Sequence, residues 1–162
     1  MSRGLGDVYK RQGTTASYTI TIPEEDSYVY GSPKVTIKIK RDYTWLNIGI
    51  GYYASQLFGE GWDQPVLKAK EANIYKLEDC ITKGYPIMFT LSDDNQELIG
   101  WDPQPTGYDK TDYGMLYFAA AGMERKGNVL SFPMQGLVVL DGGKWGVLYQ
   151  GFTETLEMPE GF

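Results

Sequence analysis

The 162-residue chain contains no histidine. Histidine is the side chain that most often acts as a general base near neutral pH, and it is the commonest transition-metal ligand. Its absence excludes Ser-His-Asp and Cys-His catalytic centres made from this chain, and any zinc site that needs a histidine. We therefore expect no metal site and no cofactor.

Cysteine is almost as scarce, because Cys80 is the only one. No disulfide can form within the chain, which favours a reducing compartment but does not exclude export. Cys80 follows Asp79 in an acidic stretch, and nearby acid raises the pKa of a thiol and opposes a reactive thiolate. We interpret Cys80 as a small core residue.

Positive charge is also in short supply. The chain has 15 lysines and arginines against 21 aspartates and glutamates, and its net charge is −6. An acidic surface repels the phosphate backbone of nucleic acids and the head groups of anionic membranes. We expect no nucleic-acid partner.

The first dozen residues differ in character from the rest. Residues 2–12 read SRGLGDVYKRQ, which resembles the translation of a sequencing-library adapter that ends in a transposon mosaic end. The alternative is a flexible basic N-terminal arm. We treat residues 1–12 as a non-native segment, which changes the net charge of the remainder to −8. Residues 13–162 then form one β-rich domain, whose natural upstream sequence, with any signal peptide, is missing.

Alternation of apolar and polar residues dominates the rest. SYTITIP and PKVTIKIKR alternate with period two, which predicts strands with one wet face. In the second segment Val35, Ile37 and Ile39 should point inward, and Lys38 and Lys40 outward.

YTWLNIGIGYY predicts a third strand. Its apolar face would hold Leu46, Ile48 and Ile50. The remaining side chains would form the opposite face: Tyr43, Trp45, Asn47, Gly49, Gly51 and Tyr53.

The following segments predict a succession of short strands. ASQLFGEG indicates a single helical turn ending at Gly59. Residues 66–84 read as strand, turn, strand, although Leu67, Ile74, Leu77 and Ile81 are also near helical spacing. PIMFTL and ELIGWD read as a hairpin around SDDNQ. A second hairpin is expected around MERKG, and a third around Asp141-Gly142-Gly143, after which TETLEM closes the sheet. About ten short strands with little helix predict an all-β fold, either an antiparallel β-sandwich or a meander barrel.

Residues 72–158 show a characteristic succession of aromatic residues and turns. It resembles that of uncharacterised β-modules in surface lipoproteins and secreted proteins of gut Bacteroidetes. The residues that carry the resemblance are Tyr75, Leu77, Phe89, Gln104 to Tyr108, Tyr113, Gly114, Tyr117 and Gly142 to Gly146. The resemblance implies a secreted or cell-surface protein, often anchored in the outer membrane through a lipid on an upstream cysteine. It implies no known reaction.

Aromatic residues supply the candidate binding site. Tyr43, Trp45 and Asn47 would stand beside Gly49 and Gly51 on one face of the third strand. Rings with an open floor can stack on a sugar, and the Asn47 amide can bind its hydroxyls. The alternative, which we favour, is that these rings pack under other parts of the protein and the glycines permit close approach.

Two further tryptophans lie in similar contexts, Trp62 in GEGWDQP and Trp101 in GWDPQP. Both are candidate exposed loop aromatics for ligand binding. Packing in the core at the ends of loops is the favoured interpretation of each.

Acidic residues offer two other chemistries. Asp93, Asp94, Asn95 and Glu97 have oxygen ligands that suit Ca²⁺, but these residue types are equally typical of a solvated hairpin turn, which we favour. Glycoside hydrolysis needs two carboxylates on either side of the scissile bond, and no carboxylate lies in a recognisable motif.

The sequence thus favours a non-catalytic exported surface module that binds glycans. The alternatives are a structural or adhesive surface domain with no small-molecule ligand, and a carboxylate-dependent glycoside hydrolase.

Overall fold

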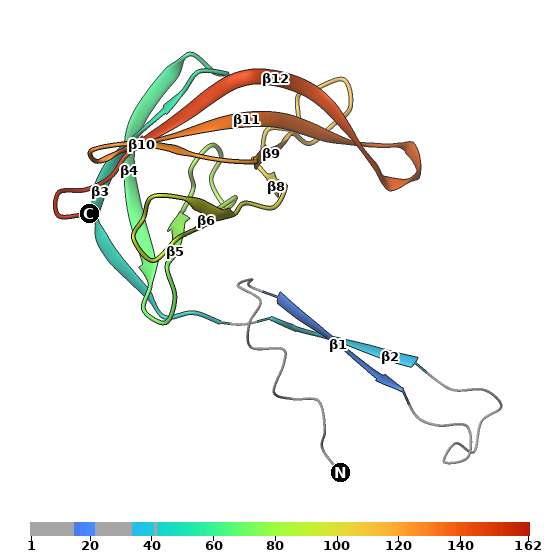
Figure 1. Ribbon diagram of the computed structural model, residues 1–162. Coiled ribbons are helices and arrows are strands. Elements are labelled where there is room, and N and C mark those ends of the chain that lie inside the picture. The colour runs from blue at the N-terminus through green and yellow to red at the C-terminus, as the bar shows by residue number, and fades with distance from the viewer. Residues whose placement is uncertain (1–14, 22–33, 41) are drawn as a thin grey trace, which may run out of the picture. The chain divides into compact units, whose positions relative to one another are not determined.

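The computed structural model describes residues 15–21, 34–40 and 42–162 (Figure 1). The chain divides into two compact units, Met1–Tyr43 and Thr44–Phe162. Among the described residues all regular structure is β-strand, apart from one 3₁₀ turn at Asp141–Gly143, which confirms the predicted all-β class. No described segment is a helix of the length and apolarity needed to cross a membrane. The adapter-like residues 2–12 lie outside the described part.

The described residues of the first unit form one antiparallel pair, β1 (Thr15–Thr21) and β2 (Lys34–Lys40). These are two of the predicted strands. Ile37 lies opposite Tyr18, and Val35 lies opposite Ile20. Directly opposed residues share one face of a sheet, so the register places the apolar positions of both strands on the same side. The predicted burial of Val35, Ile37 and Ile39 concerns side chains outside the described part.

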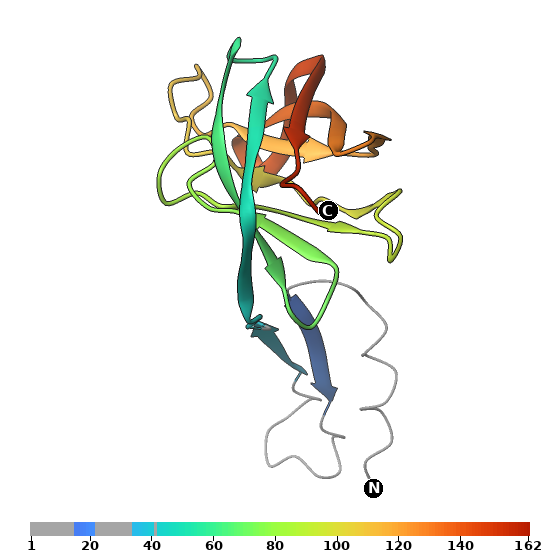
Figure 2. The same ribbon diagram turned by 90° about the vertical axis from the view of Figure 1, so that its left-hand side faces the viewer.

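The second unit is one antiparallel sheet of ten strands. The strands are β3 (Trp45–Ser55), β4 (Glu60–Ala69), β5 (Ile74–Leu77), β6 (Ile87–Leu91), β7 (Leu98–Gly100), β8 (Gln104–Pro105), β9 (Tyr117–Ala120), β10 (Glu124–Lys126), β11 (Val129–Leu140) and β12 (Lys144–Glu157). Their order is β7-β6-β5-β4-β3-β12-β11-β9-β8, and β10 pairs with β11. Figure 2 shows the long strands β3 and β4 side by side.

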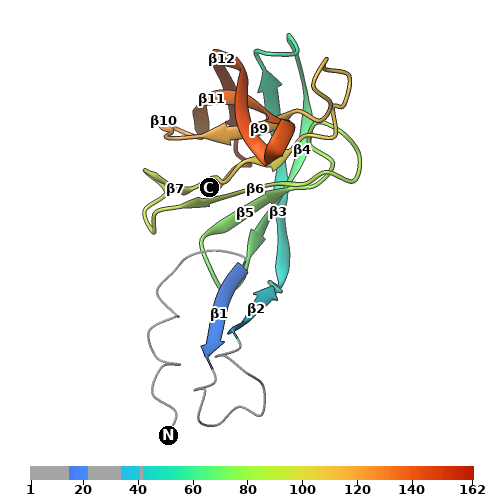
Figure 3. The same cartoon turned by 90° about the vertical axis from the view of Figure 1, so that its right-hand side faces the viewer.

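The sheet curls on itself, so that β11 comes to face β6 (Figure 3). The rings of Phe89 in β6 and Phe132 in β11 pack with centroids 5.3 Å apart. β6 and β8 are not neighbours in the strand order. Between them, the Gln104 side chain forms hydrogen bonds in place of backbone pairing. Its Oε1 accepts a hydrogen bond from the Met88 N–H at 2.7 Å, and its Nε2 donates to the Met88 carbonyl at 2.6 Å. One amide side chain thus links β8 to β6 and closes the curl.

The interior of the curl is the hydrophobic core. Its fully buried members include five aromatic rings: Tyr53, Tyr75, Phe89, Phe118 and Phe132. Cys80 is 3% exposed and belongs to the same cluster, as predicted. Burial raises the pKa of its thiol well above the ordinary value.

Most of the predicted turns are confirmed. The chain reverses between β11 and β12 at Asp141–Gly143, where Gly142 and Gly143 have φ of 77° and 75°, a region that favours glycine. Gly59 ends a single helical turn, in which its N–H donates to the Ser55 carbonyl at 2.9 Å. One detail of the predicted second hairpin is wrong. MERKG contains the short strand β10, which pairs with β11, so the loop itself is part of the sheet.

The predicted faces of β3 are only half right. Asn47 pairs with Leu67 and Gly49 with Val66, so Ile48 is an extra residue in a β-bulge. A bulge shifts the alternation by one residue, which exchanges the two faces of the strand beyond it. Ile50 is therefore 65% exposed, while Tyr53 is fully buried. The prediction that Ile50 shares the inner face is wrong for this reason.

Candidate functional site

The open floor expected beside Trp45 does not exist. A Cβ added at Gly51 would collide with the backbone carbonyl oxygen of Glu157, and one at Gly49 would lie 2.8 Å from the Cβ of Pro159. The segment at the end of β12 fills the space that the two glycines leave. The two glycines thus permit the close approach of another segment, which is one part of the alternative interpretation.

The other members of the third-strand site have structural partners. The Lys76 ammonium lies 4.6 Å from the centroid of the half-buried Trp45 ring, a cation–π contact. Asn47 is exposed, and its Oδ1 accepts a hydrogen bond from the Gly49 N–H at 2.9 Å, across the bulge. Tyr43 is half-buried and belongs to the first unit. Within the second unit, Gly49 and Gly51 leave no open floor beside Trp45 and Asn47.

Trp101 belongs to the core. It is 7% exposed and stacks on Phe89 with centroids 5.6 Å apart and planes 13° apart. Phe132 packs on it at 5.0 Å, and its Nε1 donates to the Phe118 carbonyl at 3.3 Å. The core-packing interpretation of Trp101 is confirmed.

Trp62 has a different environment. It is half-buried, its ring lies 5.2 Å from that of Tyr53, and its Nε1 donates to Gln64 Oε1 at 3.3 Å. It lines a hollow of about 500 Å³, which we call the Trp62 hollow. The residues that line it are Phe58, Glu60, Gly61, Trp62, Asp79, Cys80, Ile81, Thr82 and Tyr108.

Three loops build the Trp62 hollow. The helical turn after β3 presents Phe58, whose ring packs on Tyr108 with centroids 5.4 Å apart. Asp79 has a left-handed backbone, and its Oδ1 accepts from the Gly84 N–H at 2.6 Å, which fixes the loop after β5. Gly107 brings the loop of Tyr108 against that segment, because a Cβ there would lie 2.5 Å from Thr82.

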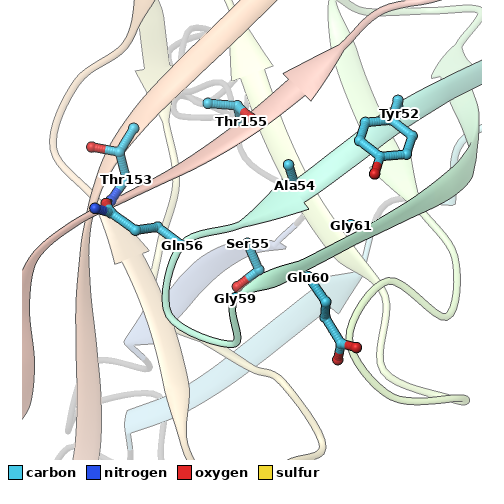
Figure 4. A pocket seen from close by; sticks show the side chains of 9 residues that line it. All are labelled: Tyr52, Ala54, Ser55, Gln56, Gly59, Glu60, Gly61, Thr153 and Thr155. Atoms are coloured by element: carbon cyan, nitrogen blue, oxygen red, sulfur yellow. The ribbon is translucent and has the colours of Figure 1, made fainter.

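A second hollow, of about 540 Å³, lies on the other side of the β3–β4 turn (Figure 4). We call it the Tyr52 groove. Its lining is Tyr52, Ala54, Ser55, Gln56, Gly59, Glu60, Gly61, Thr153 and Thr155. Tyr52 is 46% exposed, and its ring lies against Gly61, since a Cβ there would be 2.8 Å from Tyr52 Cζ. Glu60 and Gly61 line both hollows, so the two are neighbours across β4.

A buried carboxyl group anchors the turn between the hollows. Glu154 is fully buried, and its Oε1 accepts hydrogen bonds from Ser55 Oγ at 2.9 Å and from the Leu57 N–H at 3.4 Å. Its Oε2 and the Tyr53 hydroxyl make no well-formed hydrogen bond within residues 42–162. Burial raises the pKa of the Glu154 carboxyl above its usual 4.5, because the interior disfavours the charged form.

This burial predicts a pH-dependent stability. The folded form binds the Glu154 proton more tightly than the unfolded form. The contribution of Glu154 to the free energy of unfolding is therefore highest below about pH 4.5 and falls as the pH rises through the elevated folded pKa. Glu154→Gln keeps the acceptor Oε1 and carries no charge. In denaturant titrations its stability advantage over the wild type should grow with pH. Glu157→Gln, an exposed change on the same strand, is the control. A constant difference between Glu154→Gln and wild type would contradict a buried carboxyl with a raised pKa.

The acidic loop of residues 93–97 folds as a turn. Asp94 Oδ1 accepts from Ser92 Oγ at 2.6 Å, and this bond lowers the pKa of Asp94. Asn95 Oδ1 accepts from Asn73 Nδ2 at 2.7 Å. Within the described residues no three acidic or cysteine side chains are grouped as metal ligands would be. These contacts fit the hairpin-turn interpretation.

No family model, no curated protein and no solved structure matches the chain. The site is therefore defined by its geometry alone. Of the predicted residues only Trp62 lies in it. Sequence reasoning missed Phe58, Asp79 and Tyr108, although QLFG and PTGYD mark the two loops that present Phe58 and Tyr108.

Proposed function

We propose that this protein is a non-catalytic, exported surface module that binds glycans in the Trp62 hollow. The observation that carries the proposal is the lining of that hollow. Three aromatic residues, Phe58, Trp62 and Tyr108, share it with the carboxylates of Glu60 and Asp79. Aromatic rings stack on the apolar face of a sugar, and carboxylates accept hydrogen bonds from its hydroxyl groups.

The size of the two hollows favours a ligand of more than one ring. Each lies within the range of about 300–1,000 Å³ that is typical of small-molecule sites. The Tyr52 groove adds a half-exposed ring, two threonine hydroxyls and the Gln56 amide next to the Trp62 hollow. An oligosaccharide that passes over Gly61 would contact both. We therefore propose the groove as an extension of the same site.

The proposed location, secreted or at the cell surface, rests on the resemblance of residues 72–158 to surface modules. Outer-membrane anchoring through an upstream segment is part of the same proposal. The net charge of −6 supports a neutral partner such as a glycan over a nucleic acid.

A glycan array probed with the full chain tests the proposal. Glycans that bind should lose at least about tenfold in affinity, or roughly 1.4 kcal/mol, with Trp62→Ala, because the stacking surface is removed. Trp145→Ala is the matched control. Trp145 is 51% exposed on the β11–β12 hairpin, outside both hollows, so this variant should bind as the wild type does.

A second variant guards against a loss of binding through misfolding. Glu60 is exposed and lines both hollows, so Glu60→Gln should weaken the same glycans while the melting temperature stays unchanged. An array without hits, or hits that bind both variants normally, would contradict the proposal. Release of new reducing ends from a bound glycan, lost in Glu60→Gln, would favour the hydrolase instead.

One specific observation supports the structural or adhesive alternative. The β11–β12 hairpin exposes Val139, Leu140, Trp145, Val147 and Tyr149, each at 40% or more. Exposed apolar side chains gathered on one element mark surfaces that contact other molecules. If no glycan binds, this hairpin is the surface that an adhesive module would use.

A further inference from the structure

A third pocket lies toward the other end of β3 and β4. It holds about 230 Å³, and we call it the Lys68 pocket. Its lining is Ile48, Lys68, Tyr75, Asn95, Pro159, Glu160, Gly161 and Phe162. Lys68 is six residues from Trp62 along β4, roughly 20 Å at the rise of an extended strand. The Lys68 pocket is therefore separate from the Trp62 hollow.

Two side chains that line this pocket carry hydrogen-bond donors without an ion-pair or hydrogen-bond partner among the described residues. Lys68 forms no ion pair with any described residue, because the only salt bridge in that part of the chain joins Lys76 to Glu78. The Asn95 side chain accepts with its Oδ1 from Asn73 Nδ2 and lies 3.1 Å from the Tyr75 hydroxyl. Its Nδ2 makes no hydrogen bond within the described residues. An ammonium and an amide NH₂ group are thus available to a ligand.

A second cation lies behind the pocket wall. The Arg125 guanidinium packs 4.6 Å from the centroid of the Phe162 ring and donates to the Asn95 carbonyl at 3.3 Å. In a chain with a net charge of −6, two cations next to one pocket raise the local potential. Two carboxylates oppose them: Glu160, which is exposed and also lines the pocket, and Asp94, which interacts electrostatically with Arg125.

The other walls are apolar. The Tyr75 and Phe162 rings meet edge to face with centroids 5.7 Å apart, and Lys68 Nζ lies 5.6 Å from the Tyr75 ring centroid. Ile48 and Pro159 complete the apolar surface. Since a liquid water molecule occupies about 30 Å³, the pocket has room for a ligand on the order of ten non-hydrogen atoms.

We infer that the Lys68 pocket binds a small monocarboxylate with an apolar body. The ligand carboxylate would take the Lys68 ammonium and the Asn95 amide as donors, a charge-assisted arrangement. Its apolar body would pack against Ile48, Pro159 and the two rings. This site is independent of the proposed glycan site.

Benzoate and benzamide, which have the same shape and differ in charge, are suitable probes. Titration of the full chain, followed by NMR, should show binding of benzoate and at least about tenfold weaker binding of benzamide. Lys68→Met should weaken benzoate about tenfold or more, whereas Lys70→Met, an exposed change just after the end of β4, should not. Glu160→Gln should strengthen benzoate about twofold to fivefold, because it removes one opposing charge.

Three results would overturn the inference. They are equal affinity for benzoate and benzamide, unchanged benzoate affinity in Lys68→Met, and no benzoate binding at about 10 mM. If Lys68→Met fails to fold, Glu160→Gln still tests the inference, because Glu160 is exposed and its substitution should not disturb the fold. A weaker benzoate affinity in Glu160→Gln would also contradict the assigned charges. None of these results bears on the glycan array.

Discussion

Trp101→Ala should lower the free energy of unfolding by about 3–5 kcal/mol, the range for removal of a buried aromatic side chain. Trp101 is 7% exposed and packs between Phe89 and Phe132, with ring centroids 5.6 and 5.0 Å away. These two residues come from β6 and β11, which face each other across the core. The substitution therefore opens a cavity where the two sides of the curled sheet meet, and it removes the hydrogen bond to the Phe118 carbonyl.

A second tryptophan provides the control. Trp145 is 51% exposed and contacts Tyr117 edge to face at 5.0 Å, so Trp145→Ala should cost less than about 1 kcal/mol. Trp101→Phe should fall between the two, since it keeps a ring but loses the indole N–H. Urea titrations of the three variants give the comparison. Similar losses for Trp101→Ala and Trp145→Ala would show that Trp101 is not a core residue in solution.

The fold class could be predicted because its signals are local. Period-two alternation identifies a strand within a few residues, and the Asp141-Gly142-Gly143 turn requires the left-handed backbone that glycine allows. The same holds for Gly59 after the helical turn. Each of these features is determined by neighbours in the sequence.

The arrangement of the site depends on distant contacts, and the sequence does not display them. Trp62 and Trp101 share a similar Gly-Trp-Asp context, yet one lines a hollow and the other fills the core. Their fates differ because β6 and β11 close over Trp101, whereas three loops meet beside Trp62. Gln104 likewise gives no local sign that its amide will join β8 to β6.

The two faces of β3 show how one residue can mislead an alternation pattern. Apolar residues at 46, 48 and 50 suggest an unbroken strand, but the bulge at Ile48 moves Ile50 to the outside. A bulge cannot be seen in the alternation itself, because it exists only relative to the partner strand β4. Gly49, with φ of 130°, is the one local sign of it.

Gly51→Ala should be strongly destabilising. The added methyl group would meet the backbone carbonyl oxygen of Glu157, and Val66 Cγ2 at 3.3 Å. Backbone cannot rotate away as a side chain can. β12 and β3 pair over only four residue pairs, from Glu154–Ser55 to Glu157–Tyr52, and this seam joins the two halves of the sheet. Overpacking there should cost about 3 kcal/mol, the upper part of the usual range.

The matched control for Gly51→Ala is Gly122→Ala. No atom lies within 4 Å of a Cβ built at Gly122, and its φ is not positive, so this variant should stay within about 0.5 kcal/mol of wild type or gain slightly through a less flexible unfolded chain. Denaturant titrations of the full chain compare the two. A Gly51→Ala variant as stable as Gly122→Ala would contradict the close approach of β12 to Gly51.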